Sequence, residues 1–228
     1  MLKTNKNHFI KLLITGAVLG ASASVIAYEK GDVQLRFGLA NVSPDDDSSE
    51  IFIAGVPVAD TGIEVQGDTT LDLTITYFQT DKLAYEVLLV TPFSNDIDSE
   101  GMGGLKIGDT DTLPPTFSVL YYPVGTGDDL KPYVGAGINY TTYLSPDVSD
   151  DFKAALGSAD LDISDSVGIA LQAGVDYEIN DSWGVNAGVR YIQIEADATI
   201  KLKPSGTKIE VTSDIDPFVF QVNAVYNF

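Results

Sequence analysis

The sequence predicts an all-β protein, an eight-stranded antiparallel transmembrane β-barrel with short periplasmic turns and longer extracellular loops. Three observations predict this fold: segments of alternating polarity recur along the chain, the C-terminus is such a segment, and short and long connections alternate. From Phe218 to Phe228 every second residue is apolar, while Gln221, Asn223 and Asn227 share the opposite face. A period of two indicates a strand with one apolar face, and about ten residues suffice for a strand to cross a bilayer.

The first 27 residues predict a secretory signal peptide. Lysines form a basic start, and residues 12–27 are apolar and rich in small side chains. Cleavage after Ala27 leaves residues 28–228 as the transmembrane β-barrel, and cleavage after Ala23 is an alternative. A membrane-anchoring helix is the other alternative, although sixteen residues with two glycines are short for a bilayer span.

Composition excludes several kinds of chemistry from the mature chain. Cysteine is absent, and the single histidine, His8, lies in the predicted signal peptide. Ser-His, Cys-His and histidine–metal sites are therefore excluded, so we predict no enzyme, no catalytic residue, no cofactor and no metal site. The loss of three lysines lowers the net charge from −20 to −23. That charge argues against a nucleic-acid partner, because phosphate binding needs Lys and Arg.

Alternating polarity predicts the eight strands in order. They cover residues 33–39, 69–78, 83–91, 116–122, 133–143, 167–178, 183–202 and 208–228. The first two place Arg36 and Asp72 on their polar faces, and the third has a weakly polar second face that includes Glu86. The fourth offers apolar Phe117 and the fifth sets apolar residues against glycines. The sixth alternates over its whole length, and the seventh begins with the same pattern at Trp183.

Connection lengths favour a barrel over a β-sandwich, which is the alternative way to cover the apolar faces. Three connections are short, near residues 80–82, 125–129 and 180–181, and three are long, at residues 41–62, 93–112 and 145–165. This alternation is typical of outer-membrane barrels. The long connections carry a net charge of −14, and a short helical turn is expected near residues 150–156. The last outer hairpin turns at residues 204–206 and should stand above the bilayer.

Aromatic residues cluster at the end with the short turns. The set comprises Tyr77, Tyr85, Tyr121, Tyr177, Trp183, Tyr226 and Phe228. Such a girdle is typical of the membrane interface of a barrel. We therefore interpret Trp183 as an interface anchor rather than a side chain that stacks on a ligand.

Several short motifs, in their order and spacing, resemble the outer membrane protein W family of eight-stranded barrels over essentially all of the mature chain. They are Thr91-Pro92-Phe93, Leu113-Pro114-Pro115-Thr116, Tyr121-Tyr122-Pro123-Val124-Gly125, Lys131-Pro132-Tyr133-Val134-Gly135-Ala136-Gly137, Asn139-Tyr140-Thr141-Thr142, Leu171-Gln172-Ala173-Gly174-Val175-Asp176-Tyr177, Val189-Arg190-Tyr191 and Asp214-Ile215-Asp216-Pro217. The first outer connection, residues 43–63, looks particular to this chain.

The resemblance implies a protein of the bacterial outer membrane that assists the uptake of small hydrophobic molecules. Relatives in the family are linked to alkane or aromatic uptake and to stress responses, and some serve as bacteriocin receptors. The implied partners are outer-membrane lipid and lipopolysaccharide, small hydrophobic solutes, and the barrel assembly machinery. The end of the chain at Phe228 resembles the signature by which that machinery recognises its substrates.

The inward face near the periplasmic side predicts a charged plug. It holds Arg36, Asp72, Glu86, Asp176, Glu178 and Arg190. An eight-stranded barrel is just wide enough for side chains to fill, and buried charges are costly unless they pair. We therefore expect two arginines and four carboxylates to form a salt-bridge network that closes the lower lumen. A proton or ion path is the alternative.

Further from the periplasm the inward positions become apolar, at Leu88, Val90, Ile192 and Val219. This predicts a hydrophobic upper lumen that a solute enters from outside. The plug would force the solute to leave sideways, and proline at the tops of the third and fourth strands removes ladder donors. We therefore hypothesise a lateral opening at Pro92, Pro114 and Pro115. The alternative is that these prolines only end their strands.

The carboxylate runs favour solvated loops over metal sites, because no segment has Ca²⁺-loop spacing with its glycine. Divalent bridging to lipopolysaccharide stays an alternative. Two functions compete: passive uptake of hydrophobic solutes, and a structural, stress-related or receptor role at the surface without transport. A carboxylate-only hydrolase is a third, but no converging pair of carboxylates is identifiable.

Overall fold

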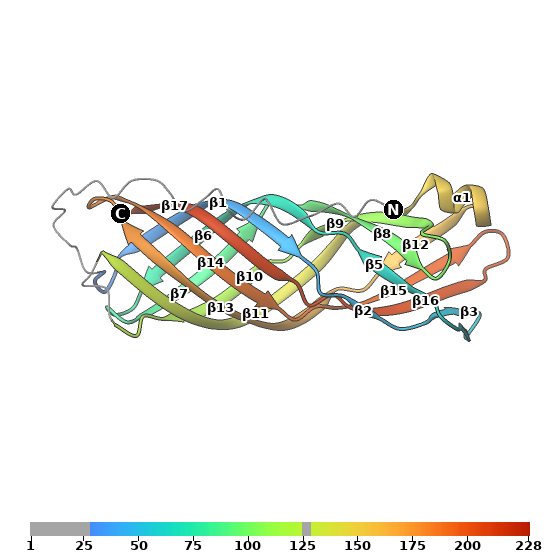
Figure 1. The fold of residues 1–228 in the computed structure, drawn as a ribbon, viewed down its shortest axis with the longest axis horizontal. Helices are drawn as coiled ribbons and strands as arrows, with labels where there is room; N and C mark the ends of the chain where they lie inside the picture. Colours follow the sequence, from blue (N-terminus) through green and yellow to red (C-terminus); the bar gives the residue numbers. More distant parts are fainter. Residues whose placement is uncertain (1–27, 125–128) are drawn as a thin grey trace, which may run out of the picture.

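The computed structural model describes residues 28–124 and 129–228, which form β-structure apart from one short helix (Figure 1). Eight strands build the end of the molecule that holds the C-terminus: β1 (Val33–Ser43), β6 (Asp68–Phe78), β7 (Leu83–Val90), β10 (Thr116–Tyr121), β11 (Leu130–Val148), β13 (Ser166–Glu178), β14 (Trp183–Ile192) and β17 (Phe218–Asn227). The predicted signal peptide, residues 1–27, and part of the predicted turn at 125–129 lie outside the described residues.

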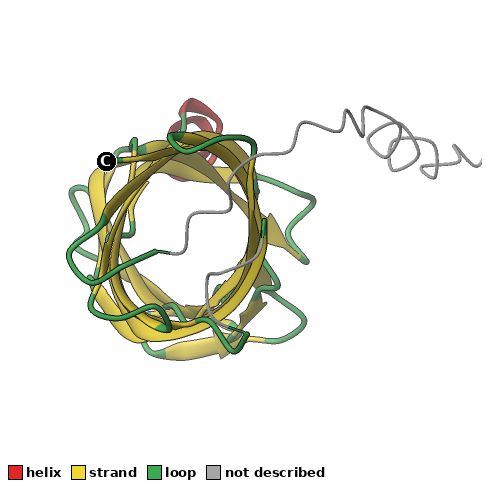
Figure 2. Cartoon of the chain, turned by 90° about the vertical axis from the view of Figure 1, so that its left-hand side faces the viewer, coloured by secondary structure: helices red, strands yellow, loops and turns green. Residues whose placement is uncertain are grey.

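These eight strands close into a ring, as the view along the axis shows (Figure 2). Their order around the ring is β1, β6, β7, β10, β11, β13, β14 and β17, and every neighbouring pair is antiparallel. The ring closes where β1 pairs with β17, from Gln34 opposite Asn227 to Ser43 opposite Phe218. The predicted eight-stranded antiparallel barrel is therefore confirmed, and the β-sandwich is wrong.

The apolar face of each strand points outward. Lipid contacts this face, so no second layer of protein is needed to shield it from water. Val222, for example, is 67% exposed although it lies in the middle of β17, with ladder partners on both sides. At the short-turn end, the ring of Trp183 lies 4.9 Å from that of Tyr226, which in turn lies 4.8 Å from Phe228. This outward aromatic patch lies at the end where the sequence predicts an interfacial girdle.

The other end of the molecule is also built mainly of strands (Figure 1). They are β2 (Asp47–Ser48), β3 (Ile51–Ile53), β4 (Val56–Val58), β5 (Gly62–Val65), β8 (Phe93–Glu100), β9 (Lys106–Leu113), β12 (Ala159–Ile163), β15 (Glu195–Leu202) and β16 (Lys208–Asp214). The long outer connections thus carry regular structure that continues the barrel wall beyond the membrane. In β8 the inward residues Phe93, Asn95 and Ile97 alternate with exposed polar ones.

The helix expected near residues 150–156 is confirmed as α1 (Asp150–Leu156). Ser149 caps it, because its hydroxyl accepts a hydrogen bond from the backbone N–H of Phe152 at 2.9 Å. Phe152 is buried in the interior of the outer half. No helix among the described residues is long and apolar enough to cross a membrane.

Candidate functional site

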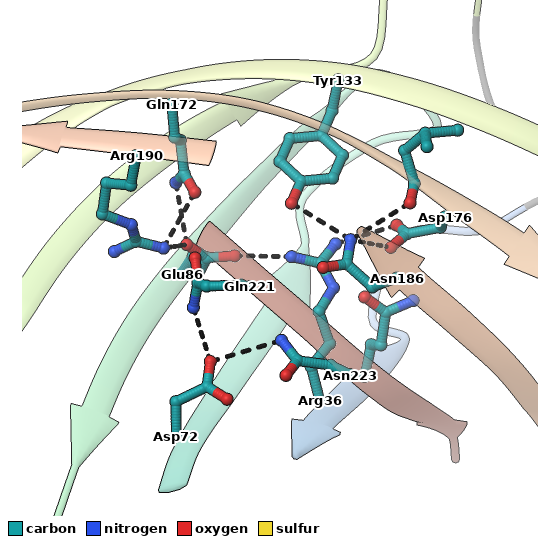
Figure 3. Close-up of polar contacts among 12 residues, drawn as sticks. Arg36, Asp72, Glu86, Tyr133, Gln172, Asp176, Asn186, Arg190, Gln221 and Asn223 are labelled. Carbon is teal, nitrogen blue, oxygen red and sulfur yellow. Dashed lines mark hydrogen bonds and ion pairs between the residues drawn. The ribbon is translucent and has the colours of Figure 1, made fainter. Parts of the chain in front are cut away.

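A network of buried charged side chains lies inside the barrel, in the half nearer the short turns (Figure 3). We call this the lower half. Arg36 donates from Nη1 to Oε2 of Glu86 at 2.7 Å and from Nη2 to Oδ2 of Asp176 at 2.8 Å. Arg190 donates from Nη2 to Oε1 of Glu86 at 2.8 Å. These four side chains are at most 2% exposed. Glu86 therefore holds two arginines in an interior where an unpaired charge would be strongly unfavourable.

Uncharged side chains add further hydrogen bonds to this network. The hydroxyl of Tyr122 accepts from Arg36 at 2.9 Å and donates to Asp176 at 3.1 Å, and Gln172 donates to Glu86 at 2.8 Å. Reasoning from charge alone missed these neutral members: Tyr122, Tyr133, Gln172, Asn186, Gln221 and Asn223. Most lie on the inward face of a predicted strand, so alternation was the signal that could have found them.

Asp72 contacts amides rather than arginine, which differs from the expected pairing. Its Oδ2 accepts hydrogen bonds from Gln221 and, at 3.3 Å, from Asn223. Asp72 and Asn223 both lie opposite Gly38, on the two strands that flank β1. A Cβ atom at residue 38 would lie 2.4 Å from Oδ1 of Asn223, so only glycine leaves room for these side chains to meet.

Glu178 also differs from the expected arginine pairing, because it forms its ion pair with Lys131. Lys131 is fully buried, and its Nζ lies 4.3 Å from the ring centroid of Tyr28. The sequence places the fifth strand from residue 133, whereas β11 begins at Leu130. Extending the alternation by two residues would have placed Lys131 on the inward face.

Aromatic side chains close the interior at the short-turn end. The ring of Phe78 lies 4.2 Å from that of Tyr28 and 5.5 Å from that of Tyr122. Tyr133 lies 5.5 Å from Tyr122, and the guanidinium of Arg36 lies 4.8 Å from its ring centroid. Cation–π contact adds to the stability of the buried arginine. The lower lumen therefore contains a packed aromatic layer beneath a packed ionic layer.

The interior on the other side of the network is apolar. Ile192 and Val219 are buried in one cluster, with half-buried Val90 packed against it. The other members of this cluster are Ala40, Val42, Phe93, Ala170, Ile194 and Ile215. Leu88 is 1% exposed and lies outside the cluster, two residues from Glu86 on β7. All four residues predicted for the hydrophobic lumen thus face the interior, and three of them pack together.

Three apolar spaces continue this cluster toward the extracellular tip. The lower space, about 50 Å³, is lined by Phe93 and Ile194 among others. A middle space of about 20 Å³ shares Ala198 with it, and an upper space of about 140 Å³ shares Ile200 with the middle one. The upper space is lined at the tip by exposed apolar residues: Ile53, Met102 and Leu156. We call the three spaces together the apolar tract.

The wall of the barrel has a break in its pairing beside this cluster. Across the hairpin, β7 and β10 pair as far as Leu88, and β8 and β9 pair from Phe93 onward. Residues 89–92 and 113–115, here called the seam, lie between these two ladders without register partners across the hairpin. The seam contains the three predicted prolines: Pro92, Pro114 and Pro115. Proline has no N–H to donate, so the break follows from the sequence.

Asn139 lies on the inner side of the seam. It is fully buried, and its Nδ2 donates to the carbonyls of Pro114 at 3.2 Å and Pro115 at 3.3 Å. The backbone N–H of Tyr140 also donates to the Pro115 carbonyl at 3.0 Å. β11 therefore holds residues 113–115 of the seam in place. Pro92, in the other segment of the seam, is exposed on the barrel surface.

Comparison with known proteins gives the same architecture. The family model described as "OmpW family" matches residues 29–228. Outer membrane protein W of Vibrio cholerae is 41% identical over 217 residues, which cover 93% of this chain and 96% of that protein. The crystal structure of OprG from Pseudomonas aeruginosa has 36% identity and a TM-score of 0.84, over 89% of this chain and 98% of that one.

The solid-state NMR structure of outer membrane protein AlkL in DMPC lipid bilayers is also similar. It has 27% identity and a TM-score of 0.65, over 94% of this chain and 97% of that one. The three proteins are named as outer-membrane proteins and none as an enzyme.

Proposed function

This chain belongs to the OmpW family of outer-membrane β-barrels, and we propose that it assists the passive uptake of small hydrophobic molecules across the bacterial outer membrane. The observation that carries the proposal is the apolar tract, which leads inward from the extracellular tip. An apolar lining favours apolar solutes, because moving their surface out of water into an apolar environment is favourable.

The ionic layer supports a route that does not run through the whole barrel. A solute passing between Arg36, Glu86 and Arg190 would separate buried charges from their partners, at a cost of several kcal/mol. The aromatic layer below would have to open as well. A hydrophobic solute therefore has an unfavourable path downward and needs another exit.

We propose that the exit is lateral, through the seam and into the bilayer. Phe93, at the end of the seam, belongs to the apolar cluster and also lines the lower space. The missing proline donors make local separation of the hairpin strands less costly than elsewhere in the wall. The exposed Pro92 and the outward apolar faces of β7 and β10 support an exit that would open toward lipid.

Uptake into a strain that lacks its own copy tests the function. The strain is compared with and without this chain, using a series of hydrophobic solutes beside a hydrophilic sugar. We expect faster uptake of the hydrophobic solutes only. If each solute entered at the same rate with and without this chain, the result would contradict transport and favour the second candidate below.

The second candidate is a structural, stress-related or receptor role at the surface, without transport. The charge of the outer part supports it, since Asp96, Asp147 and Asp160 all expose more than half of their side chains. Survival under membrane stress, compared between this chain and a variant with Asp45, Asp46 and Asp47 changed to Asn, tests this role. An effect of these changes on survival, with uptake unaltered, would favour it.

We also propose the partners that this location implies. Lipid would surround the outward apolar band, and lipopolysaccharide would surround the outer rim. Phe228 is 74% exposed and free to meet the barrel assembly machinery. Phe228→Ala should lower the amount of folded barrel in the membrane, as measured by membrane fractionation.

A further inference from the structure

The wall of the outer half is interrupted where β5 lies beside β2 (Figure 1). β5 is the last strand of the sheet that contains β8 and β9, whereas β2 and β3 belong to the sheet of β15 and β16. Within the described part of the chain, β5 has register partners on β8 only. We call the contact between residues 46–51 and residues 61–65 the sheet junction.

Side chains rather than backbone pairs hold the sheet junction together. For example, Oδ2 of Asp46 accepts a hydrogen bond from the backbone N–H of Val65 at 2.9 Å. Oγ of Ser48 accepts one from the backbone N–H of Ile63, also at 2.9 Å. Paired strands lie about 4.8 Å apart, and an inserted side chain keeps two backbones further apart than that. Each bridge is a single hydrogen bond of small net stability, so it can open by side-chain rotation without breaking a ladder.

The apolar tract lies directly behind this junction. A surface depression of about 300 Å³ covers the junction and is lined by Asp46, Ser48, Gly62 and Ile63 among others. Ile63 is only 6% exposed and also lines the lower and the middle space of the tract. Ala198 lines the same two spaces, so the depression meets the tract where these two spaces adjoin.

We propose that the sheet junction is a second entrance to the apolar tract, through which uncharged hydrophobic solutes pass from the depression into the lower space. A solute that comes from the tip has to cross the middle space, whose volume of about 20 Å³ is little more than the 10–15 Å³ that one water needs. Entry at the junction reaches the lower space directly. The depression carries Asp46, Asp47, Glu64 and Glu100, and their charge disfavours anions.

This inference rests on the proposed function and adds an entry site to it. An engineered disulfide can lock the junction, because the chain has no cysteine of its own. A Cβ atom added at Gly62 would lie 2.6 Å from Oγ of Ser48, so cysteines at these two positions bring their sulfur atoms within bonding reach. The variant is Ser48→Cys/Gly62→Cys, and the two single variants, which cannot form this disulfide, are its controls.

The measurement is the uptake rate of cyclohexane, an uncharged hydrocarbon, by the strain that lacks its own copy, at equal amounts of folded barrel. Thiol labelling followed by mass spectrometry gives the oxidised fraction of the double variant. We expect the oxidised double variant to lose part of the accelerated uptake and to regain it after reduction. The lost part is the share of uptake that uses the junction. The single variants should respond to neither treatment.

A second pair of variants tests the same entrance by opening it. Ile63→Ala removes the side chain behind the junction. Ile97→Ala is the matched control, because Ile97 is 7% exposed and lines the same lower and middle spaces but not the depression. Both changes enlarge the tract by the same atoms. We therefore expect faster uptake of cyclohexane by Ile63→Ala than by Ile97→Ala.

The outcomes separate this inference from the proposed function. Equal uptake by the oxidised and the reduced double variant would overturn the second entrance and leave the tip as the way in. Equal rates for Ile63→Ala and Ile97→Ala would overturn it as well, and this comparison decides the matter if the disulfide does not form. Uptake that the wild type does not accelerate would instead count against the proposed function itself.

Discussion

Nη2 of Arg190 lies 2.8 Å from Oε1 of Glu86, and this ion pair crosses the full width of the barrel. Arg190 is on β14 and Glu86 is on β7, which are four strands apart in either direction around the ring. Both side chains are 1% exposed. The contact therefore ties opposite walls together and places a fixed polar layer in the path of any solute that moves along the axis.

Glu86→Gln should destabilise the barrel strongly. The change keeps the size of the side chain but removes the carboxylate that both Arg36 and Arg190 contact. Leaving buried charge uncompensated typically costs about 3–5 kcal/mol. Urea unfolding of the barrel in lipid vesicles measures the loss.

Asp96→Asn is the matched control for this prediction. It removes an ion pair with Lys106 that is partly exposed in the outer half, and such pairs contribute little. Its unfolding midpoint should equal that of the wild type within error. Equal effects of the two substitutions would contradict the special role of the buried layer.

Lys131→Met should also destabilise the barrel, by about 3 kcal/mol, because Glu178 would keep a buried charge without its ion-pair partner. The double variant Lys131→Met/Glu178→Gln should recover part of the loss, since neither charge then remains. A double-mutant cycle of unfolding free energies measures the coupling. Additive effects of the two single changes would show that the pair does not act as a unit.

Replacing Pro114 and Pro115 together by Val should slow the uptake of hydrophobic solutes. Valine restores two N–H donors and lets the hairpin pair across the seam, which closes the proposed exit. Uptake by cells should fall toward the rate of the strain without the protein. Pro123→Val, at the short-turn end, is the control and should leave uptake unchanged. Undiminished uptake in the double variant would count against lateral exit and favour prolines that only end their strands.

The barrel itself was predictable because lipid and lumen impose opposite polarity on alternate residues. Arg36 and Asp176 could be assigned to the inward face from period two alone. Their partners could not, because which inward side chains meet depends on strand register and on ring closure. Gly38 illustrates this limit, since its effect on Asp72 and Asn223 appears only when β1 lies between β6 and β17.

The outer half was harder to predict from the sequence. Its strands face water rather than lipid, so the outward positions carry Asp and Ser and the segments read as polar loops. In β8, Ile97 is one of the few apolar residues, and its alternation with Asp96 and Asp98 is short. The apolar tract is the result of several such short strands, so its residues could not be grouped before the structure was known.

The most direct test of the account is to fill the apolar tract. Ala198 lines both the lower and the middle space, so Ala198→Phe should block the passage between them. Ala187→Phe, on the outward face of β14, adds the same side chain toward lipid and serves as the control. The measurement is the uptake rate of a hydrophobic solute at equal amounts of folded barrel. We predict that Ala198→Phe loses the accelerated uptake while Ala187→Phe keeps it. Full uptake by Ala198→Phe would contradict passage through the tract.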